Sequence, residues 1–389
     1  MAEYICLLNK DTIIIKPAKK TPILLRMIVL VFAMVCGVFM CSVCLKQTSI
    51  HSKIKFHDIQ VVVRLSPDDD NENLQISRVH YPNPETFSRS ECEHNPVRYF
   101  AILSMQRSGS GWFETLLNSH VNVSSNGEIF SVLDRRRNIS SITQTLDKVY
   151  NLDWFSSASK NECSAAVGFK WMLNQVIVVE KVYGTILDPN ENYQEQAIHP
   201  IRIYADAQME LCTAVLGPVS LMGVMQHHKE ISDYFNRRGV FAIFLFRRNL
   251  LRRMVSVLAN SYDRHAKLLN GTHKSHVHST EEAKTLARYK PMINSTLLIS
   301  DLKEVEITAT KALEYFNSTR HIVLYYEDLI KNPAKLKDVQ AFLGLPSMEL
   351  MSRQVKIHKG PLSDHVKNWE DVNKTLNGTA YESFLQADY

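Results

Sequence analysis

The chain has 389 residues, 45% of them hydrophobic and 22% charged, which is ordinary globular composition. It is long enough for one large α/β domain with accessory segments, or for two domains. The formal net charge of +5 is mildly basic and there is no dense basic stripe, which argues against a nucleic-acid-binding protein but suits an anionic ligand.

The first predicted element is an uncharged apolar run of 19 residues, Met27–Leu45. A bilayer core needs roughly 20 residues, and the run starts too late for a cleaved signal peptide. Basic residues are more numerous before it (Lys10, Lys16, Lys19, Lys20, Arg26) than after it (Lys46, Lys53, Lys55). This bias favours a cytoplasmic N-terminus. The sequence therefore predicts a cytoplasmic tail at 1–26, a transmembrane signal anchor at 27–45 and a lumenal remainder, as in a single-pass type II Golgi membrane protein. The alternative is a buried core helix.

Glycosylation signals agree with a lumenal body. N-x-[ST] sequons occur only after the apolar run, which predicts a glycoprotein; their asparagines are Asn122, Asn138, Asn270, Asn294, Asn317, Asn373 and Asn377. Three of the seven cysteines, Cys92, Cys163 and Cys212, also follow the run. Three thiols cannot all pair within one chain, so we expect one disulfide, without a choice among the pairings, and one free or intermolecular thiol.

The rest of the chain divides into a stem and a domain. Residues 46–95 are polar and punctuated by proline, which is typical of an extended stem. From 96 to 389, apolar runs alternate with helical patterns, which predicts βαβ units and a parallel sheet. Predicted strands are 98–103, 165–170, 240–246 and 321–326, and predicted helices are 111–119, 227–238, 249–262, 301–317 and 334–343. Ligands of such sheets bind beyond the carboxyl ends of strands, so the junctions after the first and third strands are candidate sites.

The segment 264–292 has little apolar content at its start and is expected to be an insertion or a substrate loop. It contains three histidines, His273, His276 and His278, which could bind a metal; the alternative is a solvated loop. No cysteine or acidic ligand pattern accompanies them, so no metal is expected.

The loop "LSMQRSGSGW" (103–112) joins a predicted strand to a predicted helix. Gly109 and Gly111 permit a close approach of the backbone, so that N–H groups and the positive end of the helix dipole converge on an anion. Ser108 and Ser110 supply hydroxyl donors, and Arg107 a planar guanidinium that suits phosphate or sulfate. The alternative is an ordinary tight turn between strand and helix.

Trp112 and Phe113 stand where nucleoside-triphosphate hydrolases have a lysine and a Ser/Thr. That lysine contacts the β- and γ-phosphates, and the hydroxyl binds magnesium. Their absence argues against a kinase or an ATPase.

The loop resembles the 5′-phosphosulfate loop of sulfotransferases that use 3′-phosphoadenosine-5′-phosphosulfate (PAPS), in which a basic residue precedes Ser-Gly-Ser/Thr and often Trp. In "RSGSGW" Arg107 stands in place of the more common lysine. The resemblance implies an α/β fold with a P-loop-like parallel sheet flanked by helices, here preceded by a single transmembrane helix and a stem. It implies PAPS as co-substrate without a metal, bound by the loop residues Arg107, Ser108, Gly109, Ser110, Gly111 and Trp112.

A second motif carries the same resemblance. The family's 3′-phosphate site has an arginine at a strand end and a serine eight residues later, and "FRRNLLRRMVS" places Arg248 and Ser256 at that spacing. Ser256 would lie about two turns into the helix, facing the same way as Arg248. The alternative is a basic amphipathic helix, since Arg252 and Arg253 are also present.

The closest resemblance is to nodulation-type and trehalose-type carbohydrate sulfotransferases and their plant membrane-anchored homologues, over roughly 97–369. Their "GE-x-F" segment is similar to "SNGEIF" (125–130), which implies Glu128 as the general base. "GFKWMLNQ" (168–175) implies that Lys170 faces the substrate or the sulfuryl group. "HKGPLSDHVKNW" (358–369) is distantly similar to a nucleotide lid, which implies Lys359 in cofactor binding.

By this resemblance Arg107 and the loop N–H groups stabilise the leaving phosphate, while Glu128 takes the proton of an acceptor hydroxyl. For Glu128 the alternative is a glutamate that stabilises a helix start. The acceptor would be a glycan, peptide or small molecule, and the oligomeric state is not predicted. Two other functions stay open: a lumenal glycosyltransferase that uses "DDD" (68–70), and a non-catalytic nucleotide-binding membrane glycoprotein.

Overall fold

The computed structural model describes residues 4–9, 12–17, 79–154, 163–174 and 223–386. The chain divides into two compact units, residues 1–59 and 60–389. In the first unit, β1 (Tyr4–Asn9) and β2 (Thr12–Pro17) form an antiparallel pair in which Asn9 lies opposite Thr12. The following paragraphs concern the second unit.

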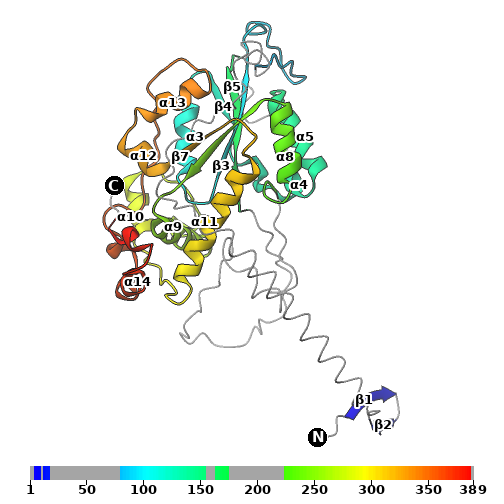
Figure 1. The fold of residues 1–389 in the computed structure, drawn as a ribbon, viewed down its shortest axis with the longest axis vertical. Helices are drawn as coiled ribbons and strands as arrows, with labels where there is room; N and C mark the ends of the chain where they lie inside the picture. Colours follow the sequence, from blue (N-terminus) through cyan, green and yellow to red (C-terminus); the bar gives the residue numbers. More distant parts are fainter. Residues whose placement is uncertain (1–3, 10–11, 18–78, 155–162, 175–222, 387–389) are drawn as a thin grey trace. The chain divides into compact units, whose positions relative to one another are not determined.

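A five-stranded parallel sheet organises this unit (Figure 1), with strand order β4-β5-β3-β6-β7. Its strands are β3 (Arg98–Ser104), β4 (Val123–Ser125), β5 (Ala166–Met172), β6 (Val240–Phe246) and β7 (His321–Tyr325). The predicted parallel sheet is present, and the four predicted strands match β3, β5, β6 and β7 to within two residues at either end. β4 was not predicted.

Helices connect and cover the strands. They are α3 (Ser110–Ser119), α4 (Leu133–Arg136), α5 (Ile139–Tyr150), α8 (His228–Arg237), α9 (Leu250–Ala266), α10 (Thr280–Ala287), α11 (Leu298–Tyr315), α12 (Tyr326–Lys331), α13 (Lys335–Phe342) and α14 (Trp369–Leu376). Short 3-10 turns occur at Ile129–Ser131, Leu362–His365 and Glu382–Leu385.

Both faces of the sheet are buried, because alternate side chains of a strand point to opposite faces. Phe100 and Ile102 of β3 pack with apolar residues of α3, α12 and α13 on one face. On the other face, Tyr99 stacks on Tyr150 of α5. This burial on both faces explains why the strands read as continuous apolar runs.

The prediction of a transmembrane helix before the domain, and of a single-pass Golgi protein, is contradicted. Within the described ranges no helix is both long and apolar enough to cross a membrane. The longest of them, α11, has 18 residues and is amphipathic: Leu298, Leu302, Val305, Ala309 and Ala312 are buried at helical spacing, and charged residues occupy the other side. The predicted anchor, 27–45, lies outside the described residues.

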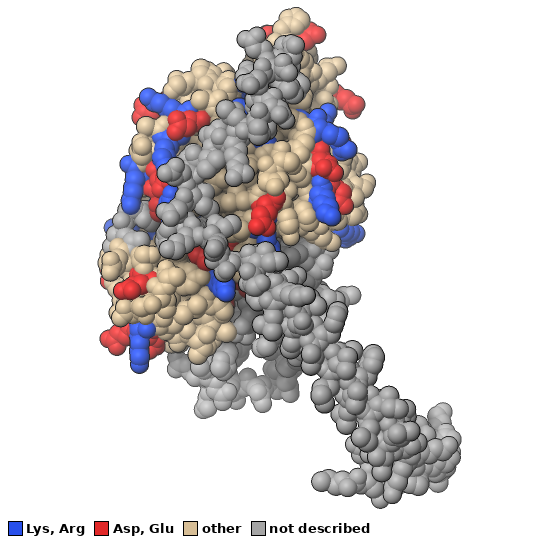
Figure 2. All heavy atoms as spheres, viewed as in Figure 1, with Lys and Arg blue, Asp and Glu red and all other residues tan. Residues whose placement is uncertain are grey.

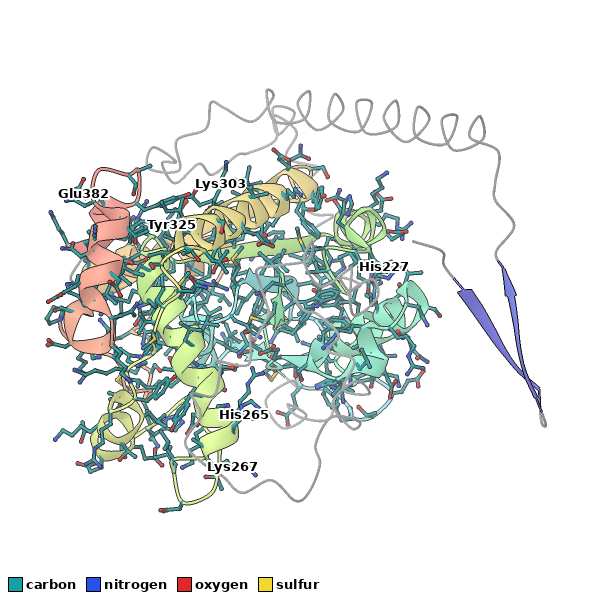
Figure 3. All side chains as sticks on the ribbon, turned by 90° about the horizontal axis from the view of Figure 1, so that it is seen from below. His227, His265, Lys267, Lys303, Tyr325 and Glu382 are labelled. Atoms are coloured by element: carbon teal, nitrogen blue, oxygen red, sulfur yellow. A yellow bond between two sulfur atoms is a disulfide. The ribbon has the colours of Figure 1, made fainter. Side chains whose placement is uncertain are left out.

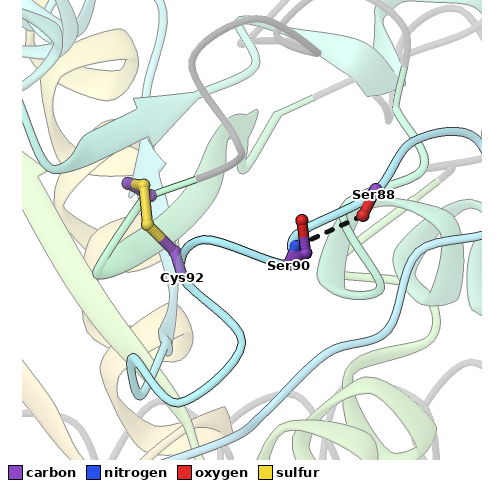
Figure 4. The surroundings of a disulfide bond; sticks show 4 residues. Ser88, Ser90 and Cys92 are labelled. Carbon is purple, nitrogen blue, oxygen red and sulfur yellow. Dashed lines mark hydrogen bonds between the residues drawn. A yellow bond between two sulfur atoms is a disulfide. The ribbon is translucent and has the colours of Figure 1, made fainter.

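A disulfide joins Cys92 to Cys163, with their Cα atoms 5.2 Å apart (Figure 4). It ties the segment before β3 to the segment before β5, at the amino ends of two paired strands. Cys212 lies outside the described residues. On the face in view in Figure 2, basic and acidic side chains are interspersed.

Candidate active site

The carboxyl ends of three neighbouring strands, β5, β3 and β6, lie side by side at one edge of the sheet. Ser104, the last residue of β3, lies beside Met172 of β5 and Leu245 of β6. The chain runs to one side of β3 through β4 and β5, and then crosses to β6 on the other side. A parallel sheet has its natural ligand crevice at such a reversal of strand order.

A cavity of about 350 Å³ lies at this edge, a volume that suits a small-molecule site. Its lining comes from the β3–α3 loop, the ends of β5 and β6, the inner side of α9, the start of α12, and two segments distant in sequence, around residues 275 and 356. The two predicted anion sites therefore contribute to a single cavity.

The β3–α3 loop brings backbone close to the cavity. Gly109 has a φ of 83°, and a Cβ built on it would lie 2.3 Å from the ring of Tyr326, so both its conformation and its contact require glycine. Gly109 is also the N-cap of α3, and no side chain in the described part of the chain caps this helix. The first-turn residues Ser110, Gly111 and Trp112 line the cavity. Their N–H groups have no partner within the helix, which leaves them to an anion.

Arg107 joins the loop to α9. Its Nε donates to Ser256 Oγ at 2.9 Å and its Nη1 donates to the Ser275 carbonyl at 2.7 Å. Burial and the nearby cations Arg247 and Arg264 lower the pKa of Arg107 to about 10, so the guanidinium stays charged at neutral pH.

The segment around Ser275, which accepts a hydrogen bond from Arg107, is itself held by side-chain hydrogen bonds. Asp263, buried near the end of α9, lies 2.7 Å from His273 Nδ1, and the other ring nitrogen of His273 lies 3.1 Å from Ser275 Oγ. Asp263 also accepts the Leu268 N–H at 2.9 Å. Figure 3 shows this end of α9, with His265 and Lys267 labelled. His273 is thus part of a hydrogen-bond chain behind the cavity, and no group in the described ranges has three or more potential metal ligands.

At the β6–α9 junction, the side chains of Arg247 and Arg248 have different surroundings. Arg248 donates from Nε and Nη2 to the two carboxylate oxygens of Asp328, at 3.0 and 2.9 Å, and lies over the ring of Tyr325. It does not line the cavity, whereas Arg247 does. The N–H groups of Arg248 and Asn249 donate to the Glu327 carboxylate. These backbone donors are therefore already satisfied.

The cavity is strongly cationic. Among the described residues that line it, Glu128 is the sole carboxylate, and the basic ones are Arg107, Lys170, Arg247, Arg252, Arg264 and Lys356. Such an excess of positive charge around a concave site favours a multiply charged anion.

Glu128 also lines the cavity, and its side chain is 35% exposed. Burial raises the pKa of Glu128, and Glu114 raises it further, whereas Lys170 lowers it. Lys170 Nζ lies 3.9 Å from Glu128 and 3.4 Å from Glu114, which is buried. A carboxylate with a raised pKa at the edge of a cationic cavity can accept a proton from a bound hydroxyl.

A C-terminal segment covers the cavity with residues 354–358. Val355 N–H donates to the Val277 carbonyl at 2.9 Å, and Arg252 Nη2 donates to the Gly360 carbonyl at 2.9 Å. Burial and the nearby His365 lower the pKa of His358 to about 3, so this cavity-lining imidazole is neutral. Lys359 is exposed and is not part of the cavity lining.

The structure thus brings together most of the predicted site residues: Arg107, Gly109, Ser110, Gly111, Trp112, Glu128, Lys170 and Ser256 line one cavity. Ser108 is buried, and neither it nor Arg248 or Lys359 lines the cavity. The sequence assigned no site role to Arg247 or Tyr326, and named Arg252 only in the alternative of a basic amphipathic helix, yet all three line the cavity. The position of Arg247 directly after β6 was an available signal, but the eight-residue spacing selected Arg248.

No protein-family model matches the chain, and no curated protein matches it. The structure is similar to the crystal structure of a sulfotransferase from Alicyclobacillus acidocaldarius, with a TM-score of 0.32 and 11% sequence identity, over 75% of this chain and 96% of that one. The likeness is weak, so the chemistry of the cavity has to be inferred from its own residues.

Proposed function

We propose that the protein transfers a sulfuryl group from PAPS to a hydroxyl group of an acceptor. One observation carries the proposal: a single cationic cavity joins the uncapped start of α3 to Ser256 and Arg247, with Glu128 at its edge. A nucleotide phosphorylated at both its 5′ and 3′ ends matches two groups of donors in one cavity. The loop lacks the lysine and the hydroxyl of magnesium-dependent phosphoryl transfer, and sulfuryl transfer does not need them.

In this proposal the first turn of α3 and Arg107 hold the 5′-phosphosulfate. Arg247, with Ser256, takes the 3′-phosphate, the role that the spacing had given to Arg248. Ser256 Oγ already accepts from Arg107 Nε, so its own proton is available to a phosphate oxygen. The bridging oxygen gains negative charge as the S–O bond breaks, and the N–H groups of the loop with Arg107 stabilise it.

Glu128 is proposed as the general base. The acceptor oxygen forms a bond to sulfur, the bond from sulfur to the bridging oxygen breaks, and the hydroxyl proton passes to Glu128. Adenosine 3′,5′-bisphosphate and the sulfated acceptor leave. The raised pKa of Glu128 makes it a stronger base than an ordinary carboxylate. In this proposal Lys170, whose Nζ lies 3.9 Å from Glu128, neutralises the sulfuryl oxygens.

A transfer assay tests the proposal. The protein is incubated with radiolabelled PAPS and a panel of glycans, peptides and small hydroxyl compounds. We expect labelled product from wild type, and a loss of about 100-fold or more with Glu128→Gln. Binding of adenosine 3′,5′-bisphosphate, measured by calorimetry, should not change in this variant.

Glu281→Gln is the matched control, because this exposed glutamate on α10 lies outside the cavity. Undiminished turnover of Glu128→Gln would remove Glu128 from the role of base. Tight bisphosphate binding without transfer to any acceptor would instead favour a non-catalytic nucleotide-binding protein. The "DDD" motif of the glycosyltransferase alternative lies outside the described residues.

A further inference from the structure

Glu114 is a buried carboxylate for which the proposed reaction has no direct use. It lies on α3, one turn after the loop, with its side chain 9% exposed. It is not part of the cavity lining. Burying a carboxylate is costly unless hydrogen bonds and an opposite charge compensate for it, so its partners indicate its role.

Both oxygens of Glu114 are engaged, each with a different part of the site. Oε1 accepts the Ser125 hydroxyl at 2.6 Å and the Gly127 N–H at 2.9 Å. Gly127, with a φ of 75°, is the residue directly before Glu128. Oε2 lies 3.4 Å from Lys170 Nζ. One side chain therefore fixes both the turn that carries Glu128 and the lysine beside it.

Lys170 Nζ is close to two carboxylates, 3.4 Å from Glu114 and 3.9 Å from Glu128. The other charged groups that face Glu128 are Arg136 on α4 and Arg264 on α9. A single lysine cannot neutralise two carboxylates fully. Because Glu114 is the nearer and more buried partner, it takes the larger share of the lysine's charge and leaves Glu128 able to accept a proton.

We propose that Glu114 is a positioning residue that holds Lys170 and the Glu128 turn in one arrangement and keeps Glu128 basic. The proposal rests on the function proposed above for Glu128. It also predicts the sign of the pH dependence. Transfer needs Glu128 deprotonated, so activity falls as pH drops through its pKa, and removing the negative charge of Glu114 should move that limb to lower pH.

Glu114→Gln is the informative variant, because its amide oxygen can still accept from Ser125 and Gly127 while the charge is lost. We expect transfer to fall at least severalfold at optimal pH, with bisphosphate affinity unchanged. The acid limb of the pH profile should move down by about one pH unit. Glu349→Gln, at an exposed position outside the cavity, is the control and should behave as wild type.

A second measurement does not depend on turnover. Carbon-13 NMR of side-chain carboxyl groups, with the Glu128 signal assigned by Glu128→Gln, gives the protonation midpoint of Glu128 in wild type and in Glu114→Gln. A lower midpoint in the variant supports the proposal even if no acceptor is sulfated, in which case only the proposed function fails. A folded Glu114→Gln with an unchanged midpoint, or one that loses thermal stability while its pH profile stays in place, would reduce Glu114 to a structural ion pair and overturn the proposal.

Discussion

Two neighbouring arginines show how a difference of one residue decides a role. Arg247 and Arg248 both follow β6, but successive side chains leave a strand in opposite directions. Arg247 lines the cavity, whereas Arg248 is held by Asp328, which raises its pKa. The eight-residue spacing is a local pattern. It cannot show that Asp328, eighty residues later in the chain, binds the Arg248 guanidinium.

At the residue scale, Arg247→Met should weaken binding of adenosine 3′,5′-bisphosphate by about 10- to 100-fold, since a charge-assisted hydrogen bond contributes roughly 1.5–3 kcal/mol. Arg248→Met is the matched comparison, because Arg248 lies outside the cavity and Asp328 keeps Lys335 as a partner at 3.2 Å. Its bisphosphate affinity should stay near that of wild type. Calorimetry measures the bisphosphate affinity of both variants. A greater loss of affinity in Arg248→Met than in Arg247→Met would assign the 3′-phosphate to Arg248.

At the element scale, the sequence predicted the long elements, whose apolar residues recur in a regular pattern, and missed the shortest strand. The long apolar strands β3 and β6 and the amphipathic helix α11 were predicted because burial leaves a strong pattern. β4 has three residues, too few for a pattern. The loop glycines were assigned from local chemistry alone. The cover formed by residues 354–358 depends on contacts with residues near 277, and such long-range pairing leaves no signal in local sequence.

The cover itself yields a prediction. Ile357 packs on a small apolar cluster, Leu269, Val277, Ala283 and Leu286, that is separate from the core of the sheet. Ile357→Ser should loosen the cover without unfolding the domain, so that binding has to order it. We expect a loss of about 1–2 kcal/mol in bisphosphate affinity, roughly five- to thirtyfold, mainly as faster dissociation. Stopped-flow kinetics measure this. Met351→Ser, three residues before the cover and 72% exposed, is the control and should leave dissociation unchanged. Equal rates in both variants would contradict a role for the cover.

At the scale of the whole molecule, the disulfide and the cavity lie at opposite ends of the strands. Cys163 precedes the first residue of β5, while Lys170 and Met172 reach the cavity from its other end. The covalent link and the candidate site thus lie at opposite ends of the same strands. The sequence narrowed the pairing to three cysteines, and only the parallel register of β3 with β5 brings Cys92 and Cys163 together.

This separation predicts that removing the disulfide lowers stability without altering the site. The bond closes a loop with a sequence separation of 71 residues, which in the chain-entropy model lowers the free energy of the folded state relative to the unfolded state by about 4 kcal/mol. Cys92→Ser/Cys163→Ser should therefore show a lower free energy of unfolding by about that amount in urea denaturation, with the bisphosphate affinity of the folded fraction unchanged. Wild type under reducing conditions is the control and should lose a similar amount. If the variant kept full stability, the bond would not constrain the fold, and if affinity fell in the folded fraction, the two ends of the sheet would be coupled.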